Sequence, residues 1–151
     1  KEQEKEKRVE RRQLAKERIP IIAKSLSECK EGISTIEDII IELTESGKAN
    51  FCYSTSNDYD DVFHIGLGEV LCKADPRLVY CGLFEEGEKI RVIVYAGDEI
   101  SKEKSAGEIV RSISQILGGA GGGSSKFAQG GGTDKSKKED AIKNAKTVIL
   151  E

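Results

Sequence analysis

Hydrophobic residues in the first third of the chain recur at a helical spacing. Gly32 is suited to end one helix, and Ser34 with Glu37 forms a capping box that starts another. We therefore expect a helix–loop–helix arm, with one continuous helix as the alternative. Intervals of four and three residues predict a heptad seam, which either packs on the chain's own globular domain or, as we prefer, forms a dimer interface. Its residues are Ile22, Leu26, Cys29, Ile33, Ile36, Ile40 and Leu43.

After Ala49 the pattern changes to the two-residue period of strands. Residues 50–56, 78–84 and 89–96 are expected strands, and residues 85–88 form a hairpin turn between the last two. Residues 62–74 are ambiguous: the spacing of Phe63, Leu67 and Val70 favours a helix, which Gly66 and Gly68 weaken. Helices are predicted over residues 105–117 and 134–150.

These elements together predict an α/β (α+β) fold. The N-terminal helix–loop–helix arm precedes a small globular domain with a mixed β-sheet flanked by helices. The expected division is a helical dimerisation subdomain in residues 1–48 and a globular α/β subdomain in residues 49–151.

Composition narrows the possible roles. A chain of 151 residues with a net charge of −3 is not a general nucleic-acid binder, so any RNA contact must be local, depend on shape or be assisted by a larger protein. The highly charged start and the lack of a long apolar run predict a cytoplasmic protein without a membrane partner. The four scattered cysteines are expected to be reduced and buried, with no metal site. The absence of methionine suggests a fragment of a longer polypeptide.

The most unusual segment is residues 118–132, in which eight of fifteen residues are glycine. Glycine permits positive φ and close approach of another backbone, so the segment predicts either a phosphate-binding surface or tight packing; a flexible spacer is the alternative. The frame fits neither a Walker A loop nor a dinucleotide fingerprint. Paired carboxylates lie only in expected turns, so we predict no catalytic residue in this chain.

Five motifs in order resemble a known family. They are Leu-Val-Tyr-Cys-Gly-Leu-Phe from position 78, Ile-Arg-Val-Ile-Val-Tyr-Ala-Gly from 90, Ala-Gly-Glu-Ile-Val from 106, the glycine cluster from 118, and Phe-Ala-Gln-Gly-Gly-Gly-Thr-Asp from 127. This set resembles the C-terminal domain of alanyl-tRNA synthetase, which contains the DHH-associated module. The chain departs from the family at Ser124, Ser125 and Lys126, where Arg-Pro-Asp is common, and at Gly130, where alanine is common.

The resemblance implies a parent enzyme, alanine–tRNA ligase, of which this fragment is a non-catalytic part. The family's C-terminal domain dimerises the enzyme and binds the outer corner of tRNA(Ala), which supports aminoacylation and editing. ATP, Mg and Zn are expected in the parent's other domains, and no cofactor is expected in this fragment.

Candidate tRNA contacts follow from the glycine segment and the basic residues near it. Phe127 either stacks on a base or anchors the core, and Gln129 either bonds a base edge or pins the loop. The full set is Gly118, Gly119, Gly121, Gly122, Gly123, Lys126, Phe127, Gln129, Gly131, Gly132, Lys102, Lys104 and Arg111.

Two other functions remain open at this point. One is an accessory domain that holds a nucleic acid for a DHH-family phosphoesterase. The other is a pure dimerisation module, in which the glycines serve packing alone.

Overall fold

A computed structural model describes most of the chain. It covers residues 6, 9, 10, 13, 14, 16–22, 24, 32–36, 39–45, 49–55 and 60–150, with main chain only for 32–36 and 39–45. Residues 16–22 are helical, Pro20 included.

Within these residues, seven strands form one mixed sheet in the order β1-β2-β3-β4-β5-β7-β6. Only β3 and β4 pair in parallel, and α2 connects them; the other neighbours are antiparallel. The elements are β1 (Gly32–Ile36), β2 (Ile39–Glu45), β3 (Asn50–Thr55), α2 (Asp61–Ala74), β4 (Leu78–Glu86), β5 (Lys89–Ala96), η1 (Ile100–Lys102), α3 (Ala106–Ile116), β6 (Ala120–Gly123), β7 (Phe127–Gly132), η2 (Lys135–Lys137) and α4 (Lys138–Leu150).

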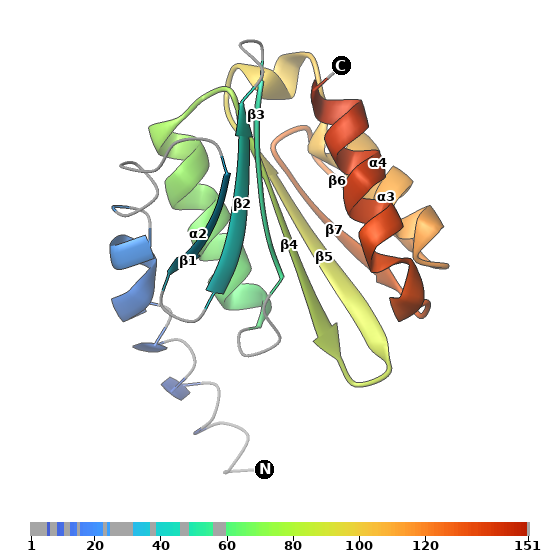
Figure 1. Cartoon of the computed structure of the whole chain (residues 1–151), viewed down its shortest axis with the longest axis horizontal. Helices are drawn as coiled ribbons and strands as arrows, with labels where there is room; N and C mark the ends of the chain where they lie inside the picture. The colour runs from blue at the N-terminus through green and yellow to red at the C-terminus, as the bar shows by residue number, and fades with distance from the viewer. Residues whose placement is uncertain are drawn as a thin grey trace.

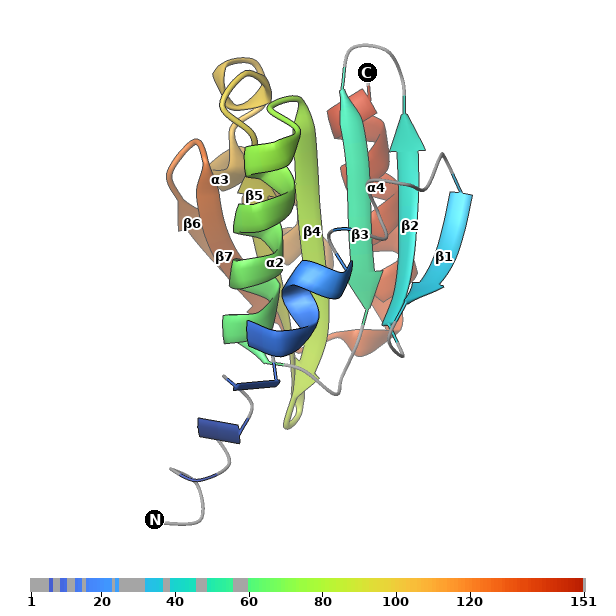
Figure 2. The same ribbon diagram turned by 90° about the vertical axis from the view of Figure 1, so that its left-hand side faces the viewer.

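Helices cover both faces of this sheet. α2 and the helical residues 16–22 lie on one face, and α3 and α4 lie on the other (Figures 1 and 2). Alternate residues of β5 divide between two core clusters: Ile90, Val92 and Val94 pack toward α3 and α4, while Tyr95 packs toward α2. The predicted mixed sheet flanked by helices is confirmed, and the ambiguous segment 62–74 is helical.

The prediction of a second helix in the N-terminal arm is wrong, because residues 32–36 and 39–45 are strands. Three consecutive isoleucines at 39–41 explain the difference, since β-branched side chains favour strands over helices. The predicted seam is lost with the helix. Ile33 and Ile36 are three residues apart on one strand, as are Ile40 and Leu43, and an odd separation places strand positions on opposite faces.

Ile22, the first residue of the predicted seam, is fully buried within its own chain. It packs with Ile19, Phe63 and Leu67 in the cluster between α2 and the sheet. A Cβ at Gly66 would lie 2.8 Å from Cδ1 of Ile19, so the glycine admits this side chain. Ile22 is therefore a core residue. Leu26 and Cys29 lie outside the described residues.

The sheet includes strands from both sides of the domain boundary expected after residue 48. β2 precedes this boundary and pairs with β3 beyond it, with Glu45 opposite Asn50. The sheet therefore crosses this position, and the division into two subdomains stays a prediction.

A buried polar cluster joins α2 to the sheet. Tyr80 Oη lies 2.6 Å from Ser54 Oγ and 2.8 Å from His64 Nδ1. The His64 ring stacks on Phe84, with centroids 5.1 Å apart. Gly82 leaves room for this ring, because a Cβ there would lie 2.7 Å from His64 Cγ. His64 thus has a structural place in the core, as its partners are other buried side chains.

The described thiols Cys52, Cys72 and Cys81 are free and buried. Burial raises the pKa of Cys52 and of Cys72 to about 12, and it raises the pKa of Cys81 further. Desolvation penalises the thiolate, so these groups keep their protons in the folded chain.

We predict that the fold loses stability above the pH at which unfolded thiols titrate, about 8.5. Because the folded pKa is raised, the thiols' contribution is intact below that pH and is lost as the pH rises toward 12. The free energy of unfolding, measured with urea in reducing buffer, should fall by about 2 kcal/mol or more between pH 8 and pH 10.5. A Cys81→Ala variant should show a shallower pH dependence; an equal slope would contradict the assignment.

Candidate nucleic-acid interface

The glycine segment folds as a hairpin instead of a spacer. β6 and β7 pair from Ala120 opposite Gly131 to Gly123 opposite Ala128. Ser124 closes the turn: its amide donates to the Phe127 carbonyl at 2.8 Å, and its Oγ accepts from the Phe127 amide at 3.1 Å. The segment therefore has a fixed backbone, and β7 joins it to β5 of the main sheet.

One face of the hairpin packs directly under α3. A Cβ on Gly121 would lie 2.8 Å from both Gly130 Cα and Ser114 Oγ, and a Cβ on Gly130 would lie 2.7 Å from Gly121 Cα. Ser114 is fully buried in this narrow space. A side chain at either glycine would push the hairpin away from the helix, so these two glycines serve packing.

Gly118 ends α3 in a left-handed conformation, with φ of 77°. The Gly119 amide donates to the Ser114 carbonyl at 2.8 Å, and the Gly118 amide donates to the Gln115 carbonyl at 3.1 Å. These two bonds form a Schellman motif, which satisfies carbonyls at the helix end. The negative end of the α3 dipole thus lies beside Gly118, so any anion bound here needs cations as well.

The N-terminus of α3 is occupied by the same hairpin. The Ala106 amide donates to the Ser125 carbonyl at 2.8 Å, and the Gly107 amide donates to the Ser124 carbonyl at 3.0 Å. These two amides therefore hold the β6–β7 turn and are not directed at a ligand.

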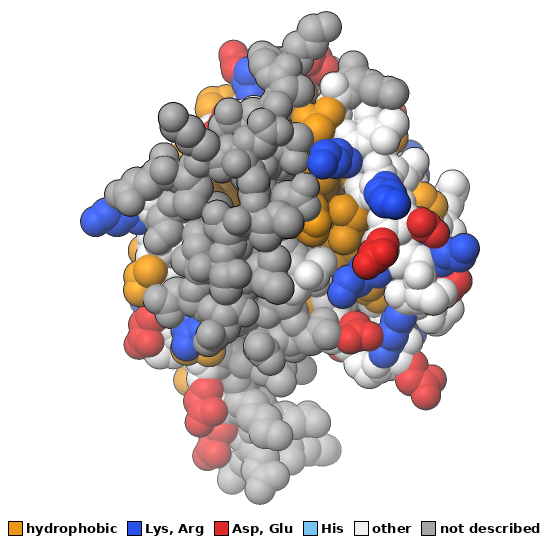
Figure 3. Space-filling model, viewed as in Figure 1, with side chains coloured by type: hydrophobic (Ala, Val, Ile, Leu, Met, Phe, Trp, Pro, Cys, Tyr) orange, Lys and Arg blue, Asp and Glu red, His pale blue; other side chains and the backbone are white. Residues whose placement is uncertain are grey.

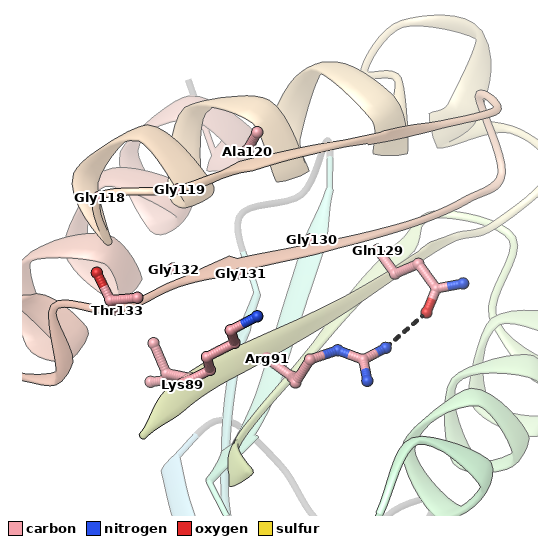
Figure 4. A pocket seen from close by; sticks show the side chains of 11 residues that line it. Lys89, Arg91, Gly118, Gly119, Ala120, Gln129, Gly130, Gly131, Gly132 and Thr133 are labelled. Carbon is pink, nitrogen blue, oxygen red and sulfur yellow. Dashed lines mark hydrogen bonds between the residues drawn. The ribbon is translucent and has the colours of Figure 1, made fainter. Parts of the chain in front are cut away.

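A hollow of about 380 Å³ opens where the hairpin meets β5. Figure 4 shows Lys89, Arg91 and Gln129 beside the glycine main chain. Among the described residues that line it none is acidic; they are Lys89, Ile90, Arg91, Gly118, Gly119, Ala120, Gln129, Gly130, Gly131, Gly132 and Thr133. Two cations next to bare main chain and a hydroxyl suit a phosphate group.

Arg91 is held in place from three sides. Its Nη2 donates to Gln129 Oε1 at 3.0 Å, its Nη1 lies 3.4 Å from Glu86 Oε2, and its guanidinium carbon lies 5.7 Å from the Phe84 ring centroid. Gln129 therefore positions Arg91, an arrangement that differs from both roles expected for this amide. Glu86 is largely exposed, so a bound phosphate can replace it at the guanidinium without burying a carboxylate.

The structure brings only part of the predicted set into this hollow: Gly118, Gly119, Gln129, Gly131 and Gly132. Gly121 faces α3, and a Cβ on Gly123 would lie 2.6 Å from Ala128 Cα. A Cβ on Gly122 would have Arg111 Nε as its nearest atom, at 4.0 Å. Lys102, Lys104 and Arg111 do not line the hollow.

Lys126 lies beyond the other end of β7, where it forms an ion pair with Asp98 at 2.9 Å. The hydrogen bond lowers the pKa of Asp98 and raises that of Lys126. The charge of Lys126 is thus matched locally, and it does not reach the hollow at the glycine main chain.

Lys89, Arg91 and Thr133 line the hollow but are not in the set expected from the sequence. The signal was present in β5, because Lys89 and Arg91 alternate with the fully buried Ile90 and Val92. Two cations at alternate positions of one strand share a face. Lys89 and Arg91 are far from the glycine segment in sequence, so the pattern does not predict that they lie beside it. They do so only because β7 pairs with β5.

Two further hollows are less suited to an anion. One, of about 280 Å³, includes Glu69 and Asp98 beside Lys73 and Lys126. The other, of about 290 Å³, is lined by Tyr53, Glu139, Ile142, Lys143 and Lys146. Figure 3 shows apolar surface between basic side chains on the face that carries α4. Both hollows contain carboxylates, which offset their lysines.

No cluster of three or more His, Cys, Asp or Glu side chains within the described part could hold a metal ion. No described helix combines the length and apolar character needed to cross a membrane.

Comparison with known proteins gives a consistent result. A family model for the DHHA1 domain matches residues 50–151. A relative from Nitrosopumilus maritimus, named alanine–tRNA ligase, is 42% identical over 150 residues, which are 99% of this chain and 16% of that protein. Another of the same name, from Cenarchaeum symbiosum, is 44% identical over 92 residues, covering 61% of this chain and 10% of the relative.

A solved structure is also similar. It is the C-Ala domain from Aquifex aeolicus alanyl-tRNA synthetase, with a TM-score of 0.68 and 25% sequence identity over 73% of this chain and 99% of that one. These findings confirm the resemblance drawn from the five sequence motifs. The chain spans only a small part of the curated relatives, 16% of the first.

We predict that the two faces of the hairpin respond differently to alanine. Gly130→Ala should lower the free energy of unfolding by about 1–3 kcal/mol, because the new methyl group meets Gly121 and Ser114. Gly122→Ala, the matched control at which a Cβ would meet no atom closer than Arg111 Nε at 4.0 Å, should change it by less than about 0.5 kcal/mol. Urea unfolding measures both. Equal losses would mean that the hairpin does not pack on α3 as described.

Proposed function

Because the chain belongs to the DHHA1 domain family, we propose that it is the C-terminal RNA-binding part of an alanine–tRNA ligase. Its role is to hold the outer corner of tRNA(Ala) while other parts of the enzyme aminoacylate the tRNA and edit mischarged products. ATP, Mg and Zn serve those other parts. The proposed setting is the cytoplasm, where translation uses the charged tRNA.

One observation carries this proposal: Lys89 and Arg91 lie beside the exposed glycine main chain in a hollow whose described lining has no carboxylate. RNA affinity depends largely on neutralised phosphates, and a chain with net charge −3 must concentrate its positive charge to bind RNA. The corner of a folded tRNA displays phosphates and sugars on an irregular surface, which suits recognition by shape.

The phosphoesterase alternative shares the DHHA1 domain and the same hollow. Relatives at 42% and 44% identity carry the name alanine–tRNA ligase, and this supports the synthetase assignment. The pure packing alternative explains Gly121 and Gly130 but gives no role to Lys89 and Arg91.

We predict that Lys89→Ala and Arg91→Ala each weaken binding of a tRNA(Ala) transcript by about tenfold, as expected for one lost charge-assisted contact. Each should also reduce the slope of log affinity against log salt by about 0.7–0.9. Filter binding at several KCl concentrations measures both quantities.

Three further variants sharpen this test. Arg91→Lys keeps the positive charge but loses the planar guanidinium. It should therefore have the salt slope of the unaltered chain but a lower affinity for the tRNA. Lys126→Ala should have a smaller effect, because Lys126 does not line the hollow. Lys143→Ala on α4 is the control on the opposite face. Unchanged affinity and slope for both Lys89→Ala and Arg91→Ala would refute the proposed site.

Self-association is the second proposed role, and it now rests on the N-terminal helical residues. Ile19 and Ile22 pack inward, whereas Ile21 keeps 48% of its surface exposed and Val9 keeps 65%. Exposed apolar side chains on a segment already packed on its other side favour contact with a second copy of the chain.

We predict that the chain sediments as a dimer and that Ile21→Glu shifts it toward monomer, because a carboxylate would have to be buried in the contact. Lys24→Glu places the same charge on an exposed position of the same segment and should leave the dimer intact. Sedimentation of the unaltered chain as a monomer at every concentration would remove this role.

A further inference from the structure

An aromatic pair lies on the same sheet face as the cations of the hollow. Tyr95 of β5 is paired in register with Phe127 of β7, and Arg91 is paired with Gly131 four residues further along. Residues separated by an even number share a face, so both pairs lie on one side of the sheet. Four residues of strand span about 13 Å.

The two rings contact each other. Their centroids are 5.6 Å apart, and their planes are inclined by 49°. Tyr95 is fixed from behind by α2, because a Cβ on Gly68 would lie 2.9 Å from Tyr95 Cβ. Phe127 is only half-buried, and it belongs to neither of the two core clusters. Its ring is therefore supported on one side and is not a core anchor.

Gln129 lies between Phe127 and Gly131 on β7, and its carbonyl oxygen accepts from Arg91. The order along the strand is thus an aromatic ring, an amide that positions a guanidinium, and bare main chain beside Lys89. An aromatic surface next to a phosphate site is the combination that binds RNA whose bases are not stacked within a duplex.

We propose that Phe127, supported by Tyr95, stacks on an unstacked base of the RNA whose phosphate occupies the Lys89–Arg91 hollow. This inference rests on the proposed function and specifies its ligand. The RNA element must display the face of a base within about 13 Å of a bound phosphate, as loops and exposed ends do and a regular duplex does not.

The chain contains no tryptophan, so Phe127→Trp introduces a single fluorescent reporter at the proposed stacking position. A folded tRNA(Ala) transcript should quench its emission, and the quenching should saturate at the affinity found by filter binding. Inorganic polyphosphate offers phosphates without bases and should bind without quenching. Val62→Trp, on an exposed position of α2, is the matched control and should not respond to tRNA.

Affinity gives an independent measurement. Phe127→Ala should weaken tRNA binding by about tenfold with an unchanged salt slope, since a stacking contact releases no counterions. Phe127→Tyr should retain the affinity. Urea unfolding of each variant separates lost stacking from lost folding.

The outcomes distinguish this inference from the function on which it depends. If Lys89→Ala and Arg91→Ala weaken binding but Phe127→Trp emission is unchanged at saturating tRNA, the stacking role alone is refuted. Equal quenching by polyphosphate would refute it as well, because the response would then follow charge. If the unaltered chain binds no tRNA, both proposals fail.

Discussion

Close contact between the β6–β7 hairpin and α3 is the constraint on which this end of the sheet, with the proposed binding site, depends. The approach is so close that a Cβ on Gly121 or on Gly130 would collide with Ser114 Oγ and with the facing glycine. The helix in turn gives its first amides to the turn of the hairpin and ends in a glycine beside the first strand. Helix and hairpin therefore fix each other at both ends, and a glycine-rich stretch acquires a defined shape without an apolar core of its own.

This arrangement divides the work between the two sides of the hairpin. The side toward α3 packs against that helix, and the opposite side carries the hollow beside Lys89 and Arg91. Main chain alone gives shape but little charge, and in the proposed site the charge comes from β5, where Lys89 and Arg91 alternate with residues of the core. Gln129 joins the two parts, because it extends from the hairpin and holds the arginine of β5. Shape and charge thus come from different segments and meet only in the folded sheet.

Much of the globular part could be predicted from sequence, because β3, β4, β5 and α3 carry clear periods and turn signals. The heptad interpretation failed at residues 32–45, where spacings of three and four residues also occur by chance within isoleucine-rich strands; the run at 39–41 was the better guide. The sequence singles out the glycine segment as a candidate binding element, but its pairing with β5 depends on contacts distant in sequence. That pairing decides which cations lie beside the glycine main chain. Lys126 was chosen because it is a neighbour in sequence, and the fold matches it with Asp98 instead.

The strand order has a consequence for synthesis of the chain. β5 lies between β4 and β7, yet β7 follows it in sequence only after α3 and β6. A nascent chain that ends before residue 127 would therefore present β5, with its run of valine and isoleucine, as an open edge able to pair with other chains. Once β7 has been synthesised, it pairs with β5 and that edge is no longer open. Changes that unfold the β6–β7 hairpin would therefore leave β5 as an unpaired strand edge.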